Sequence, residues 1–449
     1  MTGWPTLLES RTVRSGRSDG AVIRCGLADL MLADLPVSVV FFFDRVLDHT
    51  RLADALARAL ACAPAFAGRL REDGETLEIV CDDSGAPLSV YDLDDTLEQA
   101  IGRATMPGSD LVDPVDANGA RSGGGPLLTV RISRLSDGGT ALGCSWHHAV
   151  GDIQSFMTLM RAWSAAASAV EPVRAVQVPD RDAYLDSVLP AQDCGRPSLR
   201  RVDAQEAAGL DREVANALRA NRTVQIYFSD QEVARLRARF GAEAGFKLTA
   251  NDVLCAHVVS VIRGLDQDQE TRTLTIPVNI RRAMGIAPET IGNLVGDINL
   301  TGPANRPAAQ LAAEIRTAVE QFPNEHLCIR TNHAFVASVG RDRLGECVPL
   351  GFDPVRRTFT VSNWSRFGLY DIEFEGRRPV LFSPAADLLL PWVASIVEGF
   401  HGTGILCSVV VPATLAARLR GTTGRAALHP DRDEDEELPA ISRAIRKLA

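Results

Sequence analysis

The residues best suited to chemistry lie in one short stretch, HHAVGD, which runs from His147 to Asp152. An imidazole has an ordinary pKa of about 6.5, so a partly buried one is neutral at physiological pH and can remove a proton from a hydroxyl or an amine. We expect Asp152 to fix the loop by pairing with a cation rather than by touching the ring of His148, and Gly151 to permit a sharp turn. The alternative is a structural histidine pair bonded to backbone carbonyls near a helix start.

A predicted hairpin and a predicted helix position these histidines. Strands are expected over Leu127–Ile132 and Thr140–Ser145, joined by a turn of sequence SDGG. Apolar residues recur at helical spacing from Ile153 to Trp163, which predicts a helix directly after Asp152. The histidines therefore lie on a strand-to-helix turn, from which side chains project toward a cleft.

The rest of the chain predicts further strands and helices in two stretches. In the first we expect a strand over Leu35–Phe43, a helix over Thr50–Leu60 and a strand over Leu77–Cys81. In the second we expect a strand over Thr223–Phe228, a helix capped by Ser229 and Glu232, and a helix after Arg306-Pro307. The predicted boundaries are 1–195 for an N-terminal half, 196–221 for a crossover linker, 222–430 for a C-terminal half and 431–449 for a charged tail ending in a short helix.

Composition excludes several classes of protein. The 449 residues are 46% hydrophobic and 23% charged, which is typical of a globular protein of two or three domains. A net charge of −10 disfavours a nucleic-acid partner held by phosphate contacts. The longest apolar runs are too short to span a membrane, so no membrane partner is expected. Nine scattered cysteines without a C-x-x-C pair, and no secretory signal, predict free thiols and a cytoplasmic location.

Other candidate sites are not supported by their surroundings. The chain has no P-loop and no G-x-G-x-x-G turn, and the nucleophile elbow of a serine hydrolase is not expected. His257 lies in an apolar helical stretch and is expected to be a core or interface histidine. His326, His333 and His401 lack ligand-like spacing, so no metal is assigned. Cys144 is expected to pack inside its strand.

Five further segments occur with HHAVGD in one order and at one set of spacings. They are PAFAGRL (Pro64–Leu70), CDDSGAPL (Cys81–Leu88), VNIR (Val278–Arg281), IGNLV (Ile291–Val295) and SNW (Ser362–Trp364). In that order they resemble the BAHD superfamily of CoA-dependent acyltransferases, whose fold is shared with chloramphenicol acetyltransferase and peptide-synthetase condensation domains. The resemblance covers nearly the whole chain. It implies an α/β protein of two similarly folded halves, each a mixed sheet with flanking helices, that meet at an active-site channel.

The resemblance assigns roles residue by residue. His148 matches the family's catalytic histidine, and His147 matches the histidine that often precedes it. Asp152 matches an aspartate that typically pairs with an arginine, which here is Arg281. Asn279 stands where the family usually has Asp.

Ser362 and Trp364 match residues that lie near the developing oxyanion in the family. His148 would accept the acceptor's proton during attack on a thioester carbonyl, and these two side chains would stabilise the oxyanion. A thioester is already activated, so we expect direct transfer in a ternary complex without an acyl-enzyme.

Two departures from the family pattern stand out. Ile153 replaces a usual Gly, so the turn must be built with ordinary backbone angles. The segment EFEGRRP, from Glu373 to Pro379, replaces D-F-G-W-G-K-P and lacks its tryptophan. Arg377 and Arg378 would be positioned to contact CoA phosphates, or they are simply solvated surface residues.

The sequence thus predicts an acyltransferase that moves an acyl group from acyl-CoA, as co-substrate, to a hydroxyl or amine of a small-molecule acceptor. No bound cofactor is expected, and the protein is expected to be a monomer. Three alternatives remain: an acyl carrier protein as donor, a non-catalytic binding protein of the same fold, and a thioesterase with water as acceptor.

Overall fold

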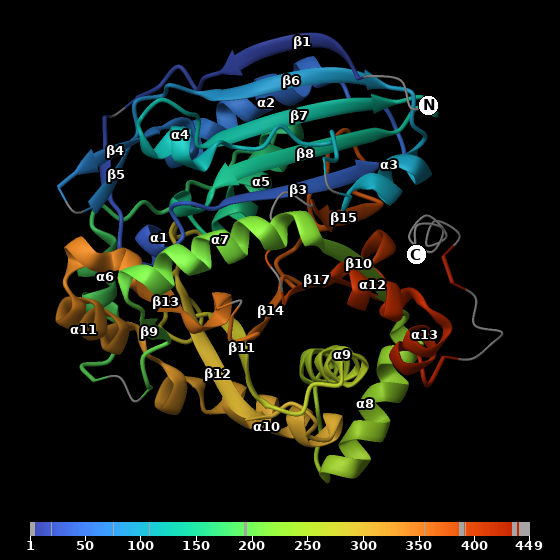
Figure 1. Ribbon diagram of the computed structural model, residues 1–449. Coiled ribbons are helices and arrows are strands. Elements are labelled where there is room, and N and C mark those ends of the chain that lie inside the picture. Colours follow the sequence, from blue (N-terminus) through green and yellow to red (C-terminus); the bar gives the residue numbers. More distant parts are fainter. Residues whose placement is uncertain are drawn as a thin grey trace.

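Two six-stranded mixed sheets form the framework of the protein (Figure 1). They are seen in a computed structural model that describes residues 5–439 except 19, 75, 107, 193–194, 354, 386–389, 391 and 433–437. In spatial order, the first sheet holds β1 (Thr6–Val13), β6 (Ala86–Leu93), β7 (Leu128–Leu135), β8 (Thr140–His147), β3 (Pro36–Phe43) and β15 (Leu381–Pro384). The second holds β10 (Asn221–Phe228), β17 (Ile405–Pro412), β16 (Val393–Glu398), β14 (Phe359–Asn363), β11 (Thr271–Asn279) and β12 (Val295–Pro303).

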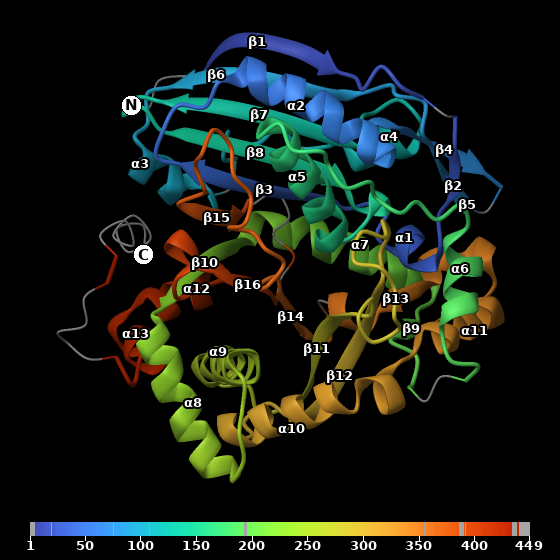
Figure 2. The ribbon, with the colours of Figure 1, turned by 180° about the vertical axis from the view of Figure 1, so that it is seen from behind.

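Helices flank both sheets. Figure 2 shows α2 (His49–Cys62) and α5 (Ile153–Ala167) over one face of the first sheet. In the second unit, α9 (Ala250–Asp266) contacts β14, and α8 (Asp230–Ala244) and α10 (Ala308–Glu320) pack on α9. The other helices are α1 (Leu27–Met31), α3 (Leu97–Arg103), α4 (Ala117–Arg121), α6 (Arg181–Val188), α7 (Ala204–Ala220), α11 (Ile329–Val339), α12 (Ala413–Arg420) and α13 (Thr422–Leu428).

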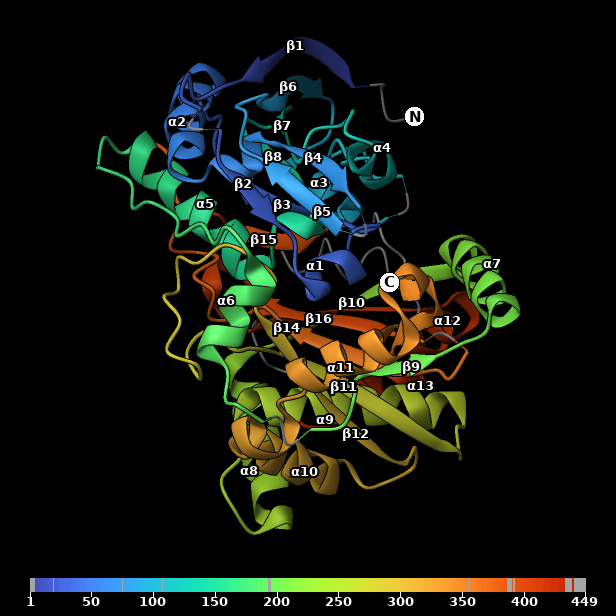
Figure 3. The ribbon, with the colours of Figure 1, turned by 90° about the vertical axis from the view of Figure 1, so that its left-hand side faces the viewer.

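Two small sheets complete the fold, and α1 lies between the two large units (Figure 3). One small sheet holds β2 (Val22–Arg24), β5 (Thr76–Val80) and β4 (Arg69–Asp73), and the other pairs β13 (Cys347–Pro349) with β9 (Leu199–Arg201). Among the described residues, no helix is both long and apolar enough to cross a membrane.

The predicted hairpin is confirmed and forms the centre of the first sheet. β7 and β8 pair antiparallel, with Leu128 opposite Trp146. All eight residues of β8 are buried, because α5 packs over it: the Trp146 ring stacks on Phe156 with centroids 4.2 Å apart. The end of β8 is therefore a rigid support for the residues that follow it.

The C-terminal half gives one segment to the first sheet. β15 pairs antiparallel with β3, with Leu381 opposite Phe42. Phe374 is fully buried in the core of the first sheet, where its ring lies 5.2 Å from that of Trp163. The halves predicted as 1–195 and 222–430 are thus joined by this exchanged segment, because its apolar side chains are buried against the other half.

The predicted crossover, residues 196–221, is more ordered than expected. It contains β9 and the 17-residue helix α7, which Figure 1 shows running across the front between the two units. The helix is rich in alanine, whose helix propensity is high, and Leu210, Val214 and Leu218 recur in it at helical spacing. This spacing was overlooked because it is carried by three large apolar residues among many alanine and charged ones.

The helix predicted after Ser229 begins at Asp230, and the Ser229 side chain accepts a hydrogen bond from the Glu232 backbone N–H. The Glu232 carboxylate is fully buried and binds His429 and Arg432 from the C-terminal end of the second unit. It therefore anchors the chain at the start of the predicted charged tail, 431–449. The short helix predicted for the end of that tail lies outside the described residues.

Candidate active site

The turn that carries the two histidines lies beside a cavity of about 390 Å³ whose wall is built by both large units. His148, Asp152, Ser362 and Trp364 all line this cavity. The first two follow β8 of the first sheet, and the last two end β14 of the second sheet. The structure thus brings together residues more than 200 positions apart in the chain.

Side chains bind four consecutive backbone carbonyls of the turn. Asn293 Nδ2 donates to the His148 carbonyl at 2.8 Å. Arg181 donates from Nη1 to the Ala149 carbonyl at 2.7 Å and from Nη2 to the Val150 carbonyl at 2.8 Å. The indole N–H of Trp146 donates to the Gly151 carbonyl at 2.9 Å. These bonds hold the backbone under His148 in one conformation.

A buried ion pair supports this arrangement. Arg181 Nη1 lies 2.9 Å from Asp29 Oδ1, and the two side chains are 3% and 2% exposed. Asp29 Oδ1 also accepts from Asn293 Nδ2 at 2.8 Å, so one carboxylate orients both donors to the turn. Burial lowers the pKa of Arg181, but the charge and hydrogen bond of Asp29, together with the charges of Cys25 and Asp152, outweigh burial and raise it, so the guanidinium stays charged.

Sequence analysis did not identify Asp29 or Arg181. No local motif surrounds either residue, and an arginine carries little information in a chain where Lys247 and Lys447 are the only lysines. Asn293 lies within the IGNLV segment. That segment contributed to the family resemblance by its position in the chain, and no role was predicted for Asn293.

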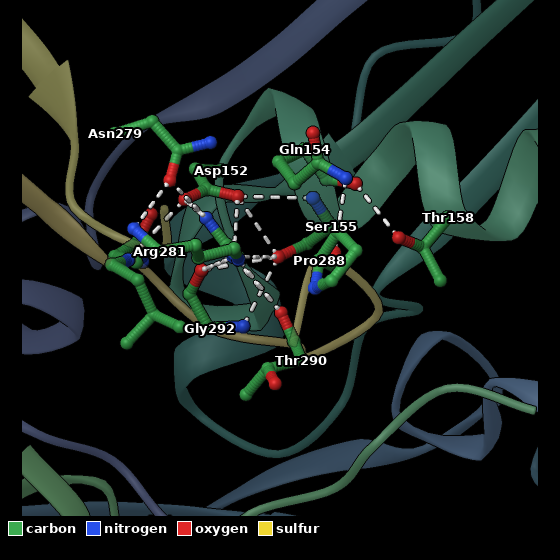
Figure 4. A network of polar contacts seen from close by, with 12 residues as sticks. Asp152, Gln154, Ser155, Thr158, Asn279, Arg281, Pro288, Thr290 and Gly292 are labelled. Carbon is green, nitrogen blue, oxygen red and sulfur yellow. Dashed lines mark hydrogen bonds and ion pairs between the residues drawn. The ribbon is translucent and has the colours of Figure 1, made fainter. Parts of the chain in front are cut away.

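The pair between Asp152 and Arg281 is present in the structure and is bidentate (Figure 4). Nη1 donates to Oδ2 at 2.7 Å and Nη2 donates to Oδ1 at 3.0 Å. Asp152 is also the N-cap of α5, since its Oδ1 accepts from the Ser155 N–H at 2.9 Å. Asn279 replaces the family's aspartate as a neutral acceptor: its Oδ1 lies 3.2 Å from Arg281 Nη1. Asp152 therefore joins the turn, the helix and the second unit.

Arg281 also holds the backbone of the second unit against α5. Its Nη2 donates to the carbonyls of Thr290 and Gly292, at 2.9 and 3.0 Å, and Figure 4 shows both acceptors beside Ser155. A bidentate arginine pair of this kind fixes geometry as well as charge. Arg281 lies behind the turn and does not line the cavity.

Gly151 is required for a different reason than the one predicted. Its φ of 160° is an extended conformation that other residues also adopt. A Cβ atom at this position would lie 2.4 Å from the Ser155 hydroxyl oxygen and 3.1 Å from the Gly292 nitrogen. The glycine therefore permits close packing of the turn on α5. Ile153 is the first residue of α5 and is not among the residues with positive φ, as expected.

His147 is held behind the turn as a neutral ring. Its Nδ1 accepts from the Ala149 N–H at 3.1 Å, which assigns the proton to Nε2, 3.3 Å from the Ala117 carbonyl oxygen. Burial lowers the pKa of His147 to about 4, and the bond to Ala117 acts in the opposite direction. His147 is thus a support for the turn rather than a base.

His148 is half-buried and faces the cavity. Its Nδ1 is buried without a hydrogen-bond partner among the described residues, which leaves Nε2 as the nitrogen available to a substrate. Burial lowers the pKa of His148, while its own backbone carbonyl and the charge of Asp152 act in the opposite direction. The ring is therefore neutral at physiological pH and suited to accept a proton.

Ser362 and Trp364 form a hydrogen-bonded pair on the opposite wall. The indole N–H of Trp364 donates to the Ser362 hydroxyl oxygen at 2.8 Å. The indole proton is thus already used, and the serine proton remains free to point toward a ligand. The sequence predicted that both side chains would donate to the oxyanion. In the structure Trp364 instead donates to Ser362 and polarises its hydroxyl, which is the group left to donate to a ligand.

Arg377 and Arg378 do not line the cavity. Arg377 closes a tight hairpin, in which it exchanges two backbone hydrogen bonds of 2.9 Å with Phe374, and Arg378 follows it. Glu375 and Gly376, at its tip, have φ values of 52° and 74°, as a type I′ turn requires. Any phosphate contact by these arginines would therefore be made outside the cavity.

The remaining candidates are structural. Cys144 is fully buried in β8, and burial raises the pKa of its thiol, which disfavours the reactive thiolate. His257 is buried in α9, where its Nε2 lies 2.8 Å from the Leu428 carbonyl oxygen, as expected for a core histidine.

Known proteins share both the sequence pattern and the fold. The model of the transferase family matches residues 23–397. Agmatine hydroxycinnamoyltransferase 1 of Oryza sativa subsp. japonica is 24% identical over 418 residues, covering 86% of this chain and 89% of the relative. The structure of vinorine synthase superposes with a TM-score of 0.67 at 17% identity, covering 92% and 96% of the two chains. F. graminearum TRI101 complexed with coenzyme A and T-2 mycotoxin superposes with a TM-score of 0.70 at 14% identity, covering 90% and 98%.

Proposed function

The chain belongs to the transferase family, the BAHD acyltransferases, and from this we propose that it transfers an acyl group from acyl-CoA to a hydroxyl or amine of a small-molecule acceptor. The observation that carries the proposal is the cavity in which His148 and the Ser362–Trp364 pair face a common space from two sheets. A neutral base and a preorganised donor are what attack on a thioester carbonyl requires.

The acyl group would pass directly from CoA to the acceptor, by addition and then collapse of a tetrahedral intermediate, without an acyl-enzyme. His148 Nε2 takes the proton from the acceptor as its oxygen or nitrogen forms a bond to the thioester carbon. The Ser362 hydroxyl, polarised by Trp364, donates to the oxyanion. When the intermediate collapses, the carbon–sulfur bond breaks, and the CoA thiolate takes the proton from His148. Holding both reactants in one cavity supplies much of the rate.

The test is acyl transfer by the full chain, with acetyl-, malonyl- and p-coumaroyl-CoA as donors and a panel of alcohols and amines as acceptors. Amines belong in this panel because the rice relative is named for agmatine. CoA release and product mass are measured together. His148→Ala should lower kcat about 10²- to 10⁴-fold, the range for loss of a general base. The exposed His401 provides the matched control, since His401→Ala should leave the rate unchanged.

Three outcomes would contradict this proposal. Transfer only from acyl carrier protein would assign the donor to a carrier-bound thioester, and release of free acid without an acceptor would indicate a thioesterase. A trapped covalent acyl-protein would exclude direct transfer. The cytoplasmic location and the monomeric state remain predictions of the sequence.

A further inference from the structure

The cavity is poor in positive charge. Among its described lining residues there is no arginine or lysine, although the chain has 47 basic residues. Two carboxylates of the described residues line it, those of Asp152 and Asp297. Asp152 is neutralised by Arg281, whereas no described cation pairs with Asp297. His333 also lines the cavity, but its Nε2 faces Asp182 at 3.5 Å.

Asp297 lies on the wall formed by β11 and β12. In the strand register it is opposite Pro277, and Val295, two residues earlier on the same face, also lines the cavity. The Ser198 side chain is its hydrogen-bond partner, and a hydroxyl satisfies only part of what a carboxylate can accept. Burial raises the pKa of Asp297 to about 6, against the effect of Ser198, so the side chain is ionised at pH 8.

A carboxylate facing a mainly apolar cavity is costly unless a positive charge compensates it. Asp29, Asp152 and Glu232 show the usual solution in this protein, since each is buried and paired with an arginine. Asp297 differs because it faces the space in which ligands bind. A cationic group of a ligand would therefore gain an ion pair for which no cation in the described part of the chain competes.

We propose that Asp297 binds a positively charged nitrogen of the acceptor, and that the acceptor class is therefore a diamine, an amino-guanidine or an amino alcohol. This inference rests on the proposed acyl transfer. The acceptor is the cationic partner because CoA carries several phosphates, which a carboxylate repels. A protonated amine has no lone pair with which to attack a carbonyl. The group at Asp297 is thus a second nitrogen, distinct from the atom that His148 deprotonates.

Matched acceptors that differ by one charge test the proposal at pH 8. We would compare 1,4-diaminobutane with 1-aminopentane, and 4-amino-1-butanol with 1-pentanol, using the donor panel described above. In each pair the wild-type protein should favour the member with the cationic end. This preference is measured as kcat/KM for the cationic member divided by kcat/KM for the neutral member. Asp297→Asn, which keeps the size and polarity of the side chain, should lower this ratio on the order of 10- to 100-fold. Asp44→Asn removes one exposed carboxylate outside the cavity and should leave the ratio unchanged.

Acceptor binding measured without an acyl donor separates the role proposed for Asp297 from the proposed acyl transfer. Calorimetric titration of 1,4-diaminobutane should show an increase in Kd of at least about tenfold for Asp297→Asn and no change for Asp44→Asn. Equal weakening in both variants would mean nonspecific attraction to a protein of net charge −10 and would overturn the inference. Transfer that does not discriminate within the pairs would overturn it while leaving the proposed function intact. Absence of transfer to every acceptor, with Asp297-dependent binding retained, would overturn the proposed function instead.

Discussion

At the candidate active site the Ser362 oxygen accepts the indole proton of Trp364, so the serine's own proton remains free to be donated. A hydroxyl that accepts one hydrogen bond becomes a better donor for the next. In this arrangement, Ser362 acts directly on the oxyanion and Trp364 acts through it.

This order predicts unequal effects of two substitutions. Ser362→Ala should lower kcat about 100-fold, the cost of one oxyanion donor in other enzymes. Trp364→Phe keeps the ring and leaves the serine proton in place, so it should lower kcat only about tenfold by the loss of polarisation. Steady-state kinetics of both variants, with KM determined separately, check the prediction. A larger loss for Trp364→Phe would mean that the indole donates directly to the substrate.

At the scale of elements, the turn after β8 is clamped by two buried ion pairs from different directions. Asp152–Arg281 ties it to the second unit, and Asp29–Arg181 ties it to α1 and α6. The buried pairs are weak evidence for net stability, but removing one partner from such a pair is strongly destabilising. We infer that their main contribution is the position of the His148 ring.

Arg181→Lys tests whether this clamp positions the base. Lysine keeps the charge beside Asp29 but lacks the planar fork that reaches two carbonyls, so the turn should loosen. We expect kcat to fall about tenfold with little change in KM, measured well below the melting temperature, since a small displacement of a reacting group is costly. A loss of melting temperature with unchanged kcat would make Arg181 a purely structural residue.

The adjacent ion pair offers a control. Arg341 pairs with Asp182 at 3.0 Å and is 39% exposed. Arg341→Ala should therefore change the free energy of unfolding by less than about 1 kcal/mol and leave kcat unchanged.

At the scale of the whole molecule, burial lowers the pKa of four described histidines: His147, His148, His257 and His326. The pKa of His147 falls to about 4. Unfolding exposes them and restores a pKa of about 6.5, so below that pH the unfolded state binds more protons than the folded one. Stability should therefore fall as the pH drops from 6.5 toward 4.

Urea unfolding at pH 7.5 and pH 5.0 measures this effect. For His147 alone the full shift corresponds to at most about 3 kcal/mol, reached only near pH 4. His257→Gln retains a donor for the Leu428 carbonyl but does not titrate, so it should reduce the loss of stability on acidification. A free energy of unfolding that is independent of pH over this range would contradict the neutral state of these rings.

The sequence by itself determined the parts of the site that depend on neighbours in the chain. The two short strand segments, the SDGG turn between them and the apolar spacing from Ile153 each depend on residues close together in the chain. They predicted the strand-to-helix turn that carries His148. The helix α7 also carries apolar residues at helical spacing, Leu210, Val214 and Leu218, and it was overlooked because alanine and charged residues surround them.

Only the tertiary structure decided which distant groups meet. Asp29 lies 264 residues before Asn293, and nothing in the types or spacing of the two residues indicates that they share a hydrogen bond. The requirement for glycine at position 151 is also a tertiary effect. A Cβ atom there would clash because of the way α5 packs on the turn. The unpaired state of Asp297 depends on the surrounding side chains, and with 45 arginines among the basic residues, only packing determines which carboxylates are neutralised.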